Sequence, residues 1–193
     1  MSLGDVTGRL SGKVAIITGA GQTPGETVGN GKAIALLFAQ AGASVLCVDQ
    51  DKDRAEATVS EITGAGGKAQ FFAADVSNPH GAAAIAEAAE AAFGPPDILI
   101  NNVGIGDAGD GPAHKLTEEA FDRTLRVNLK GAWLVTKAVL PGMRDRRAGA
   151  IVNISSLASL ACARCAQWCG TAKARRRSNS PSWRSRSSCF CSG

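Results

Sequence analysis

The fold of this chain is decided by the stretch Val14-Ala-Ile-Ile-Thr-Gly-Ala-Gly-Gln-Thr-Pro-Gly-Glu-Thr-Val-Gly-Asn-Gly31. Its first five residues are apolar or β-branched, which predicts a buried strand over Val14–Thr18. The glycines that follow predict a tight loop. Beyond this loop, Lys32–Ala41 carries apolar residues at helical spacing. A strand, a glycine-rich loop and a helix in this order indicate an α/β domain.

The same alternation of strands and helices continues along the chain. Further strands are expected over Ser44–Asp49, Ala69–Ala74, Asp97–Asn101 and Ala150–Ser155, and further helices over Asp53–Thr63, Gly81–Phe93 and Glu118–Arg146. The strand segments are apolar at successive positions, which is typical of parallel strands covered on both faces. We therefore predict an α/β fold with a doubly wound parallel sheet of five recognisable strands.

The formal net charge of +4 is a property of the carboxyl-terminal end. The last twenty residues hold five of the 21 Lys and Arg and none of the 17 Asp and Glu, which leaves 16 cations against 17 anions in residues 1–173. A body without positive excess argues against nucleic acid as a partner. The amino terminus has no basic segment followed by an apolar run, and no run approaches a membrane span in length. We therefore expect a cytoplasmic protein with no membrane partner.

The glycine-rich loop predicts a dinucleotide site. Glycines let the backbone turn tightly and approach a pyrophosphate, whose charge is met by amides at the helix N-terminus. The loop residues expected to bind the cofactor are Thr18, Gly19, Gly21, Gly29, Asn30 and Gly31. Asp49 lies 18 residues after Gly31, near the separation at which a carboxylate binds ribose hydroxyls and repels a 2′-phosphate. NAD is therefore the predicted cofactor, with NADP as the alternative because Arg54 is close by.

Several motifs in order resemble the short-chain dehydrogenase/reductase family. The loop matches the family pattern Thr-Gly-x-x-x-Gly-x-Gly with about six additional residues before Gly29. Asp75-Val76 resembles the family's adenine-contacting pair, and Asn101-Asn-Val-Gly104 resembles its Asn-Asn-Ala-Gly motif. The resemblance covers about residues 10–173 and implies a Rossmann-type fold with hydride transfer between a nicotinamide and an alcohol or carbonyl substrate. The further cofactor contacts that it implies are Asp75, Val76, Asn102, Val103, Gly104 and Lys173.

The resemblance also implies a catalytic set. Gly149-Ala-Ile-Val-Asn-Ile-Ser-Ser156 resembles the family's fifth strand, whose catalytic serine is followed by tyrosine thirteen residues later and by lysine seventeen residues later. From Ser156 these positions hold Cys169 and Lys173, and the chain contains no Tyr. Asn128 corresponds to the family's asparagine that orients a proton-relay water, or it is a buried asparagine bonded to backbone. Because a thiol is shorter than a phenol by an aromatic ring, we expect impaired turnover.

The strand and helix pattern stops after Lys173. We divide the chain into an incomplete dinucleotide-binding, Rossmann-like domain over residues 1–173 and a basic Ser/Arg-rich tail over residues 174–193, expected to be disordered. Related enzymes continue with a helix and two more strands, whose patterns this sequence lacks. Two explanations stay open: a shifted reading frame that begins near Ala161, and a genuine flexible tail.

Other functions compete with this interpretation. The first alternative is a non-catalytic dinucleotide-binding module. The second is a metal-binding or nucleic-acid-binding tail built on Cys162, Cys165, Cys169, Cys189 and Cys191. Histidine is absent nearby and the second cysteine pair is irregularly spaced, so we predict no metal site. The expected partner is a small alcohol or ketone, and a homo-oligomer through the helices of Glu118–Arg146 stays open. Cys47 is expected to be a buried strand residue.

Overall fold

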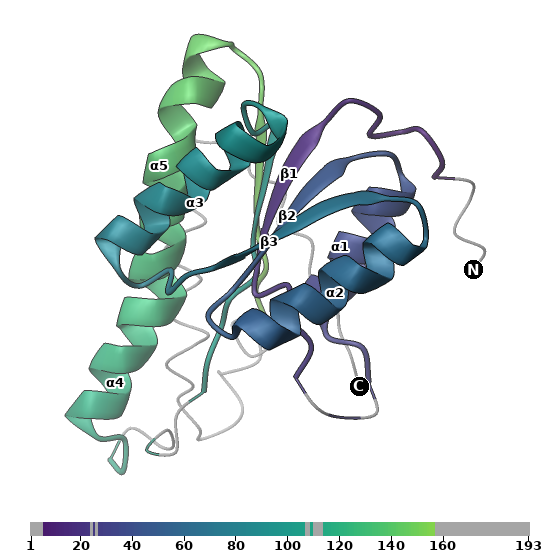
Figure 1. The fold of residues 1–193 in the computed structure, drawn as a ribbon. Coiled ribbons are helices and arrows are strands. Elements are labelled where there is room, and N and C mark those ends of the chain that lie inside the picture. The colour runs from purple at the N-terminus through teal and green to yellow at the C-terminus, as the bar shows by residue number, and fades with distance from the viewer. Residues whose placement is uncertain (1–5, 24, 26, 107–108, 110–113, 157–193) are drawn as a thin grey trace.

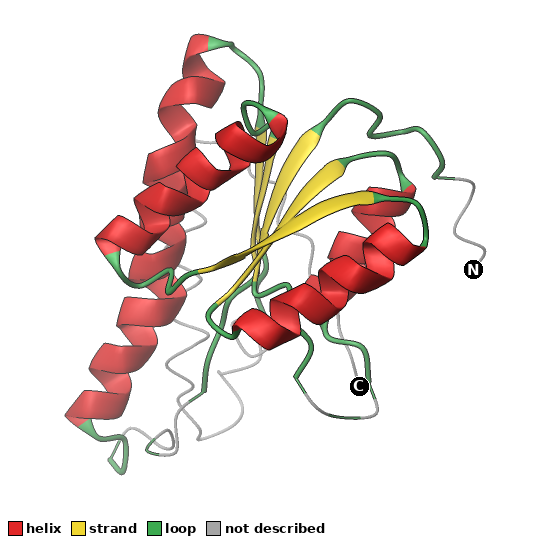
Figure 2. Ribbon diagram, viewed as in Figure 1, coloured by secondary structure: helices red, strands yellow, loops and turns green. Residues whose placement is uncertain are grey.

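The computed structural model describes residues 6–23, 25, 27–106, 109 and 114–156. Their five strands form one parallel sheet in the order β3-β2-β1-β4-β5. Figures 1 and 2 show this sheet with helices on either side of it. The strands are β1 (Val14–Thr18), β2 (Ser44–Asp49), β3 (Lys68–Ala73), β4 (Ile98–Asn101) and β5 (Ala150–Asn153). This confirms the predicted α/β, Rossmann-like fold. Because the chain order reverses between β1 and β4, a crevice is expected at their carboxyl ends.

Helices cover both faces of the sheet (Figure 1). They are α1 (Asn30–Gln40), α2 (Lys52–Gly64), α3 (Pro79–Phe93), α4 (Glu118–Leu125), the π-helix η1 (Arg126–Gly131) and α5 (Ala132–Asp145). The N-cap side chains Asp51, Asn78 and Thr117 accept hydrogen bonds from first-turn amides of α2, α3 and α4. By contrast, α1 begins after Gly29, which has no side chain to cap it. Within the described residues, no helix combines the length and the apolar character needed to cross a bilayer.

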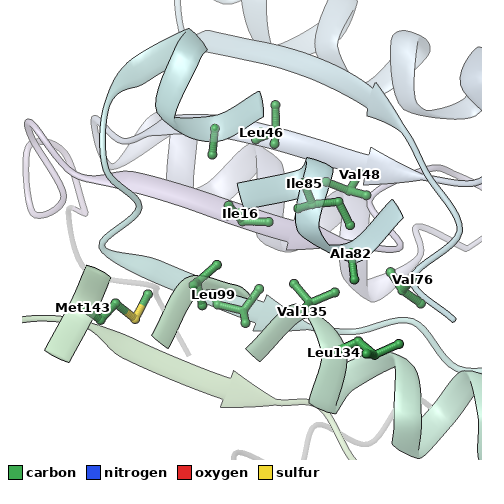
Figure 3. Close-up of a cluster of buried hydrophobic side chains, with 12 residues drawn as sticks. Ile16, Leu46, Val48, Val76, Ala82, Ile85, Leu99, Leu134, Val135 and Met143 are labelled. Atoms are coloured by element: carbon green, nitrogen blue, oxygen red, sulfur yellow. The ribbon is translucent and has the colours of Figure 1, made fainter. Parts of the chain in front are cut away.

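Two apolar clusters hold the helices on the sheet. Ile16 and Ile17 are neighbours in β1, but they belong to different clusters, because successive strand residues point to opposite faces of the sheet. Figure 3 shows the cluster under α3 and α5, where Ile16 and Leu99 of the sheet meet Ile85 and Val135 of the helices. The second cluster joins the other face of the sheet to α1 and α2. The inner strands are therefore buried on both faces, as predicted.

Cys47 belongs to this second cluster and is fully buried in β2. Burial raises the pKa of its thiol to about 12, so the group stays a neutral thiol at physiological pH. The prediction of a buried strand residue is confirmed, and Cys47 packs rather than reacts.

The structure corrects the predicted element bounds in three ways. The stretch Glu118–Arg146 is not one α-helix, because η1 interrupts it with π-helical geometry. The edge strand β3 begins at Lys68, one residue earlier than predicted, and is partly exposed rather than buried on both faces. At the other edge β5 ends at Asn153 instead of Ser155, because its pairing with β4 ends there. The bounds of β1 and β2 agree with the prediction, and the remaining ends differ from it by at most two residues.

Removing core methyl groups should reveal how much the packing contributes. We expect Val45→Ala to lower the free energy of unfolding by about 2 kcal/mol, because buried methyl groups contribute roughly 0.8 kcal/mol each and the cavity adds to the loss. Val45 is 0% exposed, whereas Val28 is 60% exposed. Val28→Ala is therefore the matched control, and its effect should stay within about 0.5 kcal/mol. Urea denaturation followed by circular dichroism measures both, and equal losses would contradict the packing described.

Candidate functional site

A cleft of about 510 Å³ opens at the carboxyl ends of the inner strands, where the strand order reverses. Ligands of open α/β sheets bind at this place. Its walls come from the loop after β1, the segments after β2, β3 and β4, and the turn where α4 meets η1. The predicted cofactor residues that line it are Gly19, Gly21, Gly29, Asn30, Gly31, Asp49, Asp75, Val76, Asn102, Val103 and Gly104.

Two glycines let the start of α1 lie directly against the end of β1. Gly19 has a φ of +67°, a conformation that favours glycine. A Cβ atom added to Gly31 would collide with the carbonyl oxygen of Gly19 and would lie 2.7 Å from Nδ2 of Asn102. Nδ2 of Asn102 also donates a hydrogen bond to that carbonyl oxygen, at 3.1 Å. Only a residue without a side chain fits at position 31.

The N-terminus of α1 opens on the cleft. Asn30 and Gly31 line the cleft, and their backbone amides have no hydrogen-bond partner among the described residues. The first turn of α1 contains no acidic residue. Unpaired amides and the positive end of the helix dipole favour an anion at this position. The arrangement therefore suits a phosphate group.

Thr18 does not line the cleft but shapes its wall. Its buried hydroxyl donates to the carbonyl oxygen of Ile100 at 3.2 Å and accepts from the backbone amides of Asn102 at 3.1 Å and Val103 at 3.5 Å. One side chain of β1 thus fixes the turn that follows β4. Thr18 positions the residues that line the cleft rather than facing the cleft itself.

The carboxylate of Asp49 joins the glycine-rich loop to the end of β2. Its Oδ2 accepts a hydrogen bond from the amide of Gly21 at 3.0 Å, and its Oδ1 accepts one from the amide of Asp51 at 3.1 Å. Each oxygen of a carboxylate can accept a second hydrogen bond, so both can still receive hydroxyl groups. Nε of Arg54, which also lines the cleft, forms an ion pair with Oδ2 of Asp51 at 2.9 Å.

Asn128 is 1% exposed and lies in the middle of η1. Its Oδ1 accepts a hydrogen bond from the amide of Ile105 at 2.8 Å, and its Nδ2 donates to the carbonyl oxygen of the same residue at 2.9 Å. The sequence left two possibilities for Asn128, and the structure shows the second of them, a buried asparagine whose side chain is bonded to backbone. Its side chain anchors the segment after β4, one of the cleft walls, to the π-helix.

Comparison with known proteins identifies the family. A family model described as short chain dehydrogenase matches residues 13–178. This chain belongs to the short-chain dehydrogenase family. Proteins of this family bind a nicotinamide dinucleotide, in agreement with the loop and the cleft described above.

Individual relatives agree with this assignment. A short-chain dehydrogenase/reductase from Burkholderia xenovorans has a TM-score of 0.81 and 39% identity, over 89% of this chain and 66% of that one. A metagenomic short-chain oxidoreductase in complex with NADP has a TM-score of 0.70 and 40% identity, over 78% and 65% of the two chains. D-threitol dehydrogenase from Mycolicibacterium smegmatis is 40% identical over 78% of this chain and 55% of that protein. The chain spans about half the length of the curated relatives it matches, from 47% to 58% of three of them.

The catalytic residues that the family resemblance predicts are only partly within the described structure. Ser156 is exposed and lies three residues past the end of β5. Cys169, Lys173 and the basic tail lie outside the described residues, as do the five clustered cysteines. Among the residues that are described, no three His, Cys, Asp or Glu side chains gather in a way that could hold a metal ion.

The sequence did not identify every residue that lines the cleft. The cleft residues outside the predicted set are Thr23, Val48, Gln50, Arg54, Ala74, Ser77, Ile105, Arg123, Arg126 and Val127. Gln50 and Ser77 follow β2 and β3, so the rule that ligands bind beyond the carboxyl ends of strands could have identified them. The arginines of α4 and η1 carry no such signal, because only the packing of these helices brings them to the cleft.

Loss of the Thr18 hydroxyl should loosen the wall of the cleft. We expect Thr18→Val to lower the free energy of unfolding by about 2 kcal/mol, since two backbone amides lose their acceptor in a partly buried place. Thr63→Val is the matched control, because the exposed Thr63 hydroxyl bonds only within its own helix. Its effect should be below about 0.5 kcal/mol. Thermal and urea unfolding of both variants provide the test, and a loss at Thr63 as large as that at Thr18 would contradict this role.

Proposed function

We propose that this chain binds NAD in the cleft beyond β1, β2 and β4, and that the protein transfers hydride between the nicotinamide and the carbon of a small alcohol or ketone. The observation that carries the proposal is the start of α1, where Asn30 and Gly31 line the cleft beside a glycine-only contact with β1 and their amides have no hydrogen-bond partner among the described residues. We assign the pyrophosphate to the amides of Asn30 and Gly31. The adenosine ribose is assigned to Asp49, and the adenine to the wall formed by Asp75 and Val76.

The charges at the end of β2 support NAD over NADP. A 2′-phosphate on the adenosine ribose would meet the carboxylate of Asp49 at the place where the ribose hydroxyls bind. Two like charges about 4 Å apart repel by about 1 kcal/mol in water and by about 4 kcal/mol near a protein surface. Arg54 could offset this repulsion, but Asp51 already holds its guanidinium. The metagenomic relative in complex with NADP keeps the phosphorylated cofactor as the competing outcome.

For the reaction, we propose that Ser156 binds the substrate oxygen and that Lys173 binds the nicotinamide ribose. Cys169 stands where the family pattern has its proton-transferring tyrosine. Its acidity is no obstacle, because a free thiol has a pKa of about 8.5 against about 10 for tyrosine. The obstacle is the short side chain, because general acid or base catalysis requires the thiol to lie within hydrogen-bonding distance of the group that exchanges the proton. Turnover by this chain is therefore slow.

An alcohol substrate agrees with one relative, which is named D-threitol dehydrogenase. We propose the cytoplasm as the compartment. The second candidate function is a dinucleotide-binding protein without catalysis, and the replacement of tyrosine by Cys169 favours it over other classes.

Asp49 gives the first test. We expect Asp49→Asn to raise the Kd for NADH about tenfold and to reduce the preference for NADH over NADPH by more than about tenfold, because the amide keeps one acceptor oxygen and no charge. Fluorescence titration with NADH and NADPH measures both constants. Asp53→Asn removes the same charge from an exposed position in the first turn of α2 and should change either Kd by less than about twofold. Tighter binding of NADPH than NADH by the unaltered chain would overturn the proposed cofactor.

Cys169 gives the second test. We expect Cys169→Tyr to raise kcat for oxidation of a secondary alcohol at least about a hundredfold, because a positioned proton donor contributes about 10² to 10⁴ in rate. The Kd for NADH should not change. Cys165→Tyr places the same side chain four residues earlier and should leave the rate at background. If the unaltered chain oxidises the alcohol as fast as the Cys169→Tyr variant, the proposed impairment is wrong.

A further inference from the structure

The additional residues of the glycine-rich loop lie between Gln22 and Gly29. Removing the six residues from 23 to 28 would leave Thr18-Gly-Ala-Gly-Gln22 joined to Gly29-Asn-Gly31, which is the family spacing Thr-Gly-x-x-x-Gly-x-Gly. The two ends of the additional segment are therefore the residues that would be neighbours in a loop of family length.

One side chain joins these two ends. Oε1 of Gln22 accepts a hydrogen bond from the amide of Gly29 at 2.9 Å. Nε2 of the same side chain donates to the carbonyl oxygens of Thr23 at 2.7 Å and Thr27 at 2.9 Å. The oxygen and both hydrogens of this amide group are thus bonded to the backbone of the additional segment or to its end.

The bond to Gly29 also completes the start of α1. The first amides of a helix have no partner within the helix, and in a capping box a Glu or Gln side chain of the first turn satisfies the amide of the N-cap residue. Here Gln22, seven residues upstream, supplies that oxygen to the N-cap residue Gly29. The next two residues, Asn30 and Gly31, line the cleft, and their amides have no hydrogen-bond partner among the described residues.

Gln22 itself is not among the residues that line the cleft, although Gly21, Thr23 and Gly29 are. A role through direct contact with the dinucleotide therefore has no support. Closing a loop costs conformational entropy, and ordering its backbone costs more. The bonds of Gln22 offset part of this cost before a ligand arrives.

We propose that Gln22 is a positioning residue for dinucleotide binding: it ties Thr23 and Thr27 of the additional segment to Gly29, and it holds Gly29 so that the start of α1 stays presented to the pyrophosphate. The inference rests on the proposed function, because it concerns the same cleft. The proposal further implies that residues 23–28 can be deleted without loss of dinucleotide binding, and that Gln22 affects the Kd only while these residues are present.

A double-mutant cycle in the full 193-residue chain tests this dependence. Gln22→Met keeps the length of the side chain and removes all three hydrogen bonds. We expect this variant to raise the Kd for NADH about tenfold. In a chain that lacks residues 23–28, the same substitution should change the Kd by less than about twofold, because the two ends are then joined covalently. Gln70→Met, on an exposed position of β3, is the matched control and should leave the Kd unchanged.

An effect of equal size in both backgrounds would overturn the proposal, because Gln22 would then act on the dinucleotide itself. So would an unchanged Kd in the full-length variant. Hydrogen exchange of the Gly29 amide, followed by NMR without ligand, is an independent readout. Gln22→Met should accelerate this exchange at least about tenfold, and an unchanged rate would overturn the proposal. If the unaltered chain binds neither NADH nor NADPH while the exchange rate responds, the proposed function fails and the closing of the loop by Gln22 stands.

Discussion

The contact between the first turn of α1 and the carbonyl oxygen of Gly19 is the constraint on which the cleft depends. A side chain at Gly31 would push the helix away from β1, so the amides of the first turn would no longer lie beside the strand ends. The carbonyl oxygen of Gly19 also accepts a hydrogen bond from Nδ2 of Asn102, so the turn after β4 is fixed to the end of β1. The start of α1, the end of β1 and the turn after β4 therefore all contact the carbonyl group of Gly19, and these contacts determine the shape of the cleft.

Around this point, polar side chains bond to backbone and thereby fix the loops. Thr18 holds the turn after β4, Asp49 holds the loop at Gly21, and Asn128 holds Ile105. Each of these loops lines the cleft. A cleft whose walls are fixed before the ligand arrives loses less conformational entropy on binding, which increases affinity without any additional contact to the ligand. In this chain the polar residues near the site thus serve largely to order backbone, and backbone amides are left to meet the phosphate.

The sequence predicted what depends on periodicity and on strand ends. Five apolar runs predicted five strands, and the order of strand, loop and helix predicted where the cleft would open. The π-helix η1 could not be predicted, because its residues keep the pattern of an ordinary helix. The exposed residues of β3 were missed for a similar reason, since edge position is a property of the sheet. The bonds of Gln22 span seven residues in an irregular loop, where no period exists.

In the proposed function, most of the dinucleotide contacts and the proton transfer depend on different parts of the chain. The cleft is built by residues that precede β5, from Gly19 to Val127. The residues proposed for substrate binding and proton transfer, Ser156 and Cys169, and the lysine proposed for the nicotinamide ribose, Lys173, follow the last strand described. The side chains that fix the cleft walls, Thr18, Asp49 and Asn128, all precede that second group in the chain. If the proposed roles hold, affinity for the cofactor depends mainly on backbone fixed near β1, whereas the rate of proton transfer depends on the length of one side chain, so a change at position 169 would alter turnover more than binding.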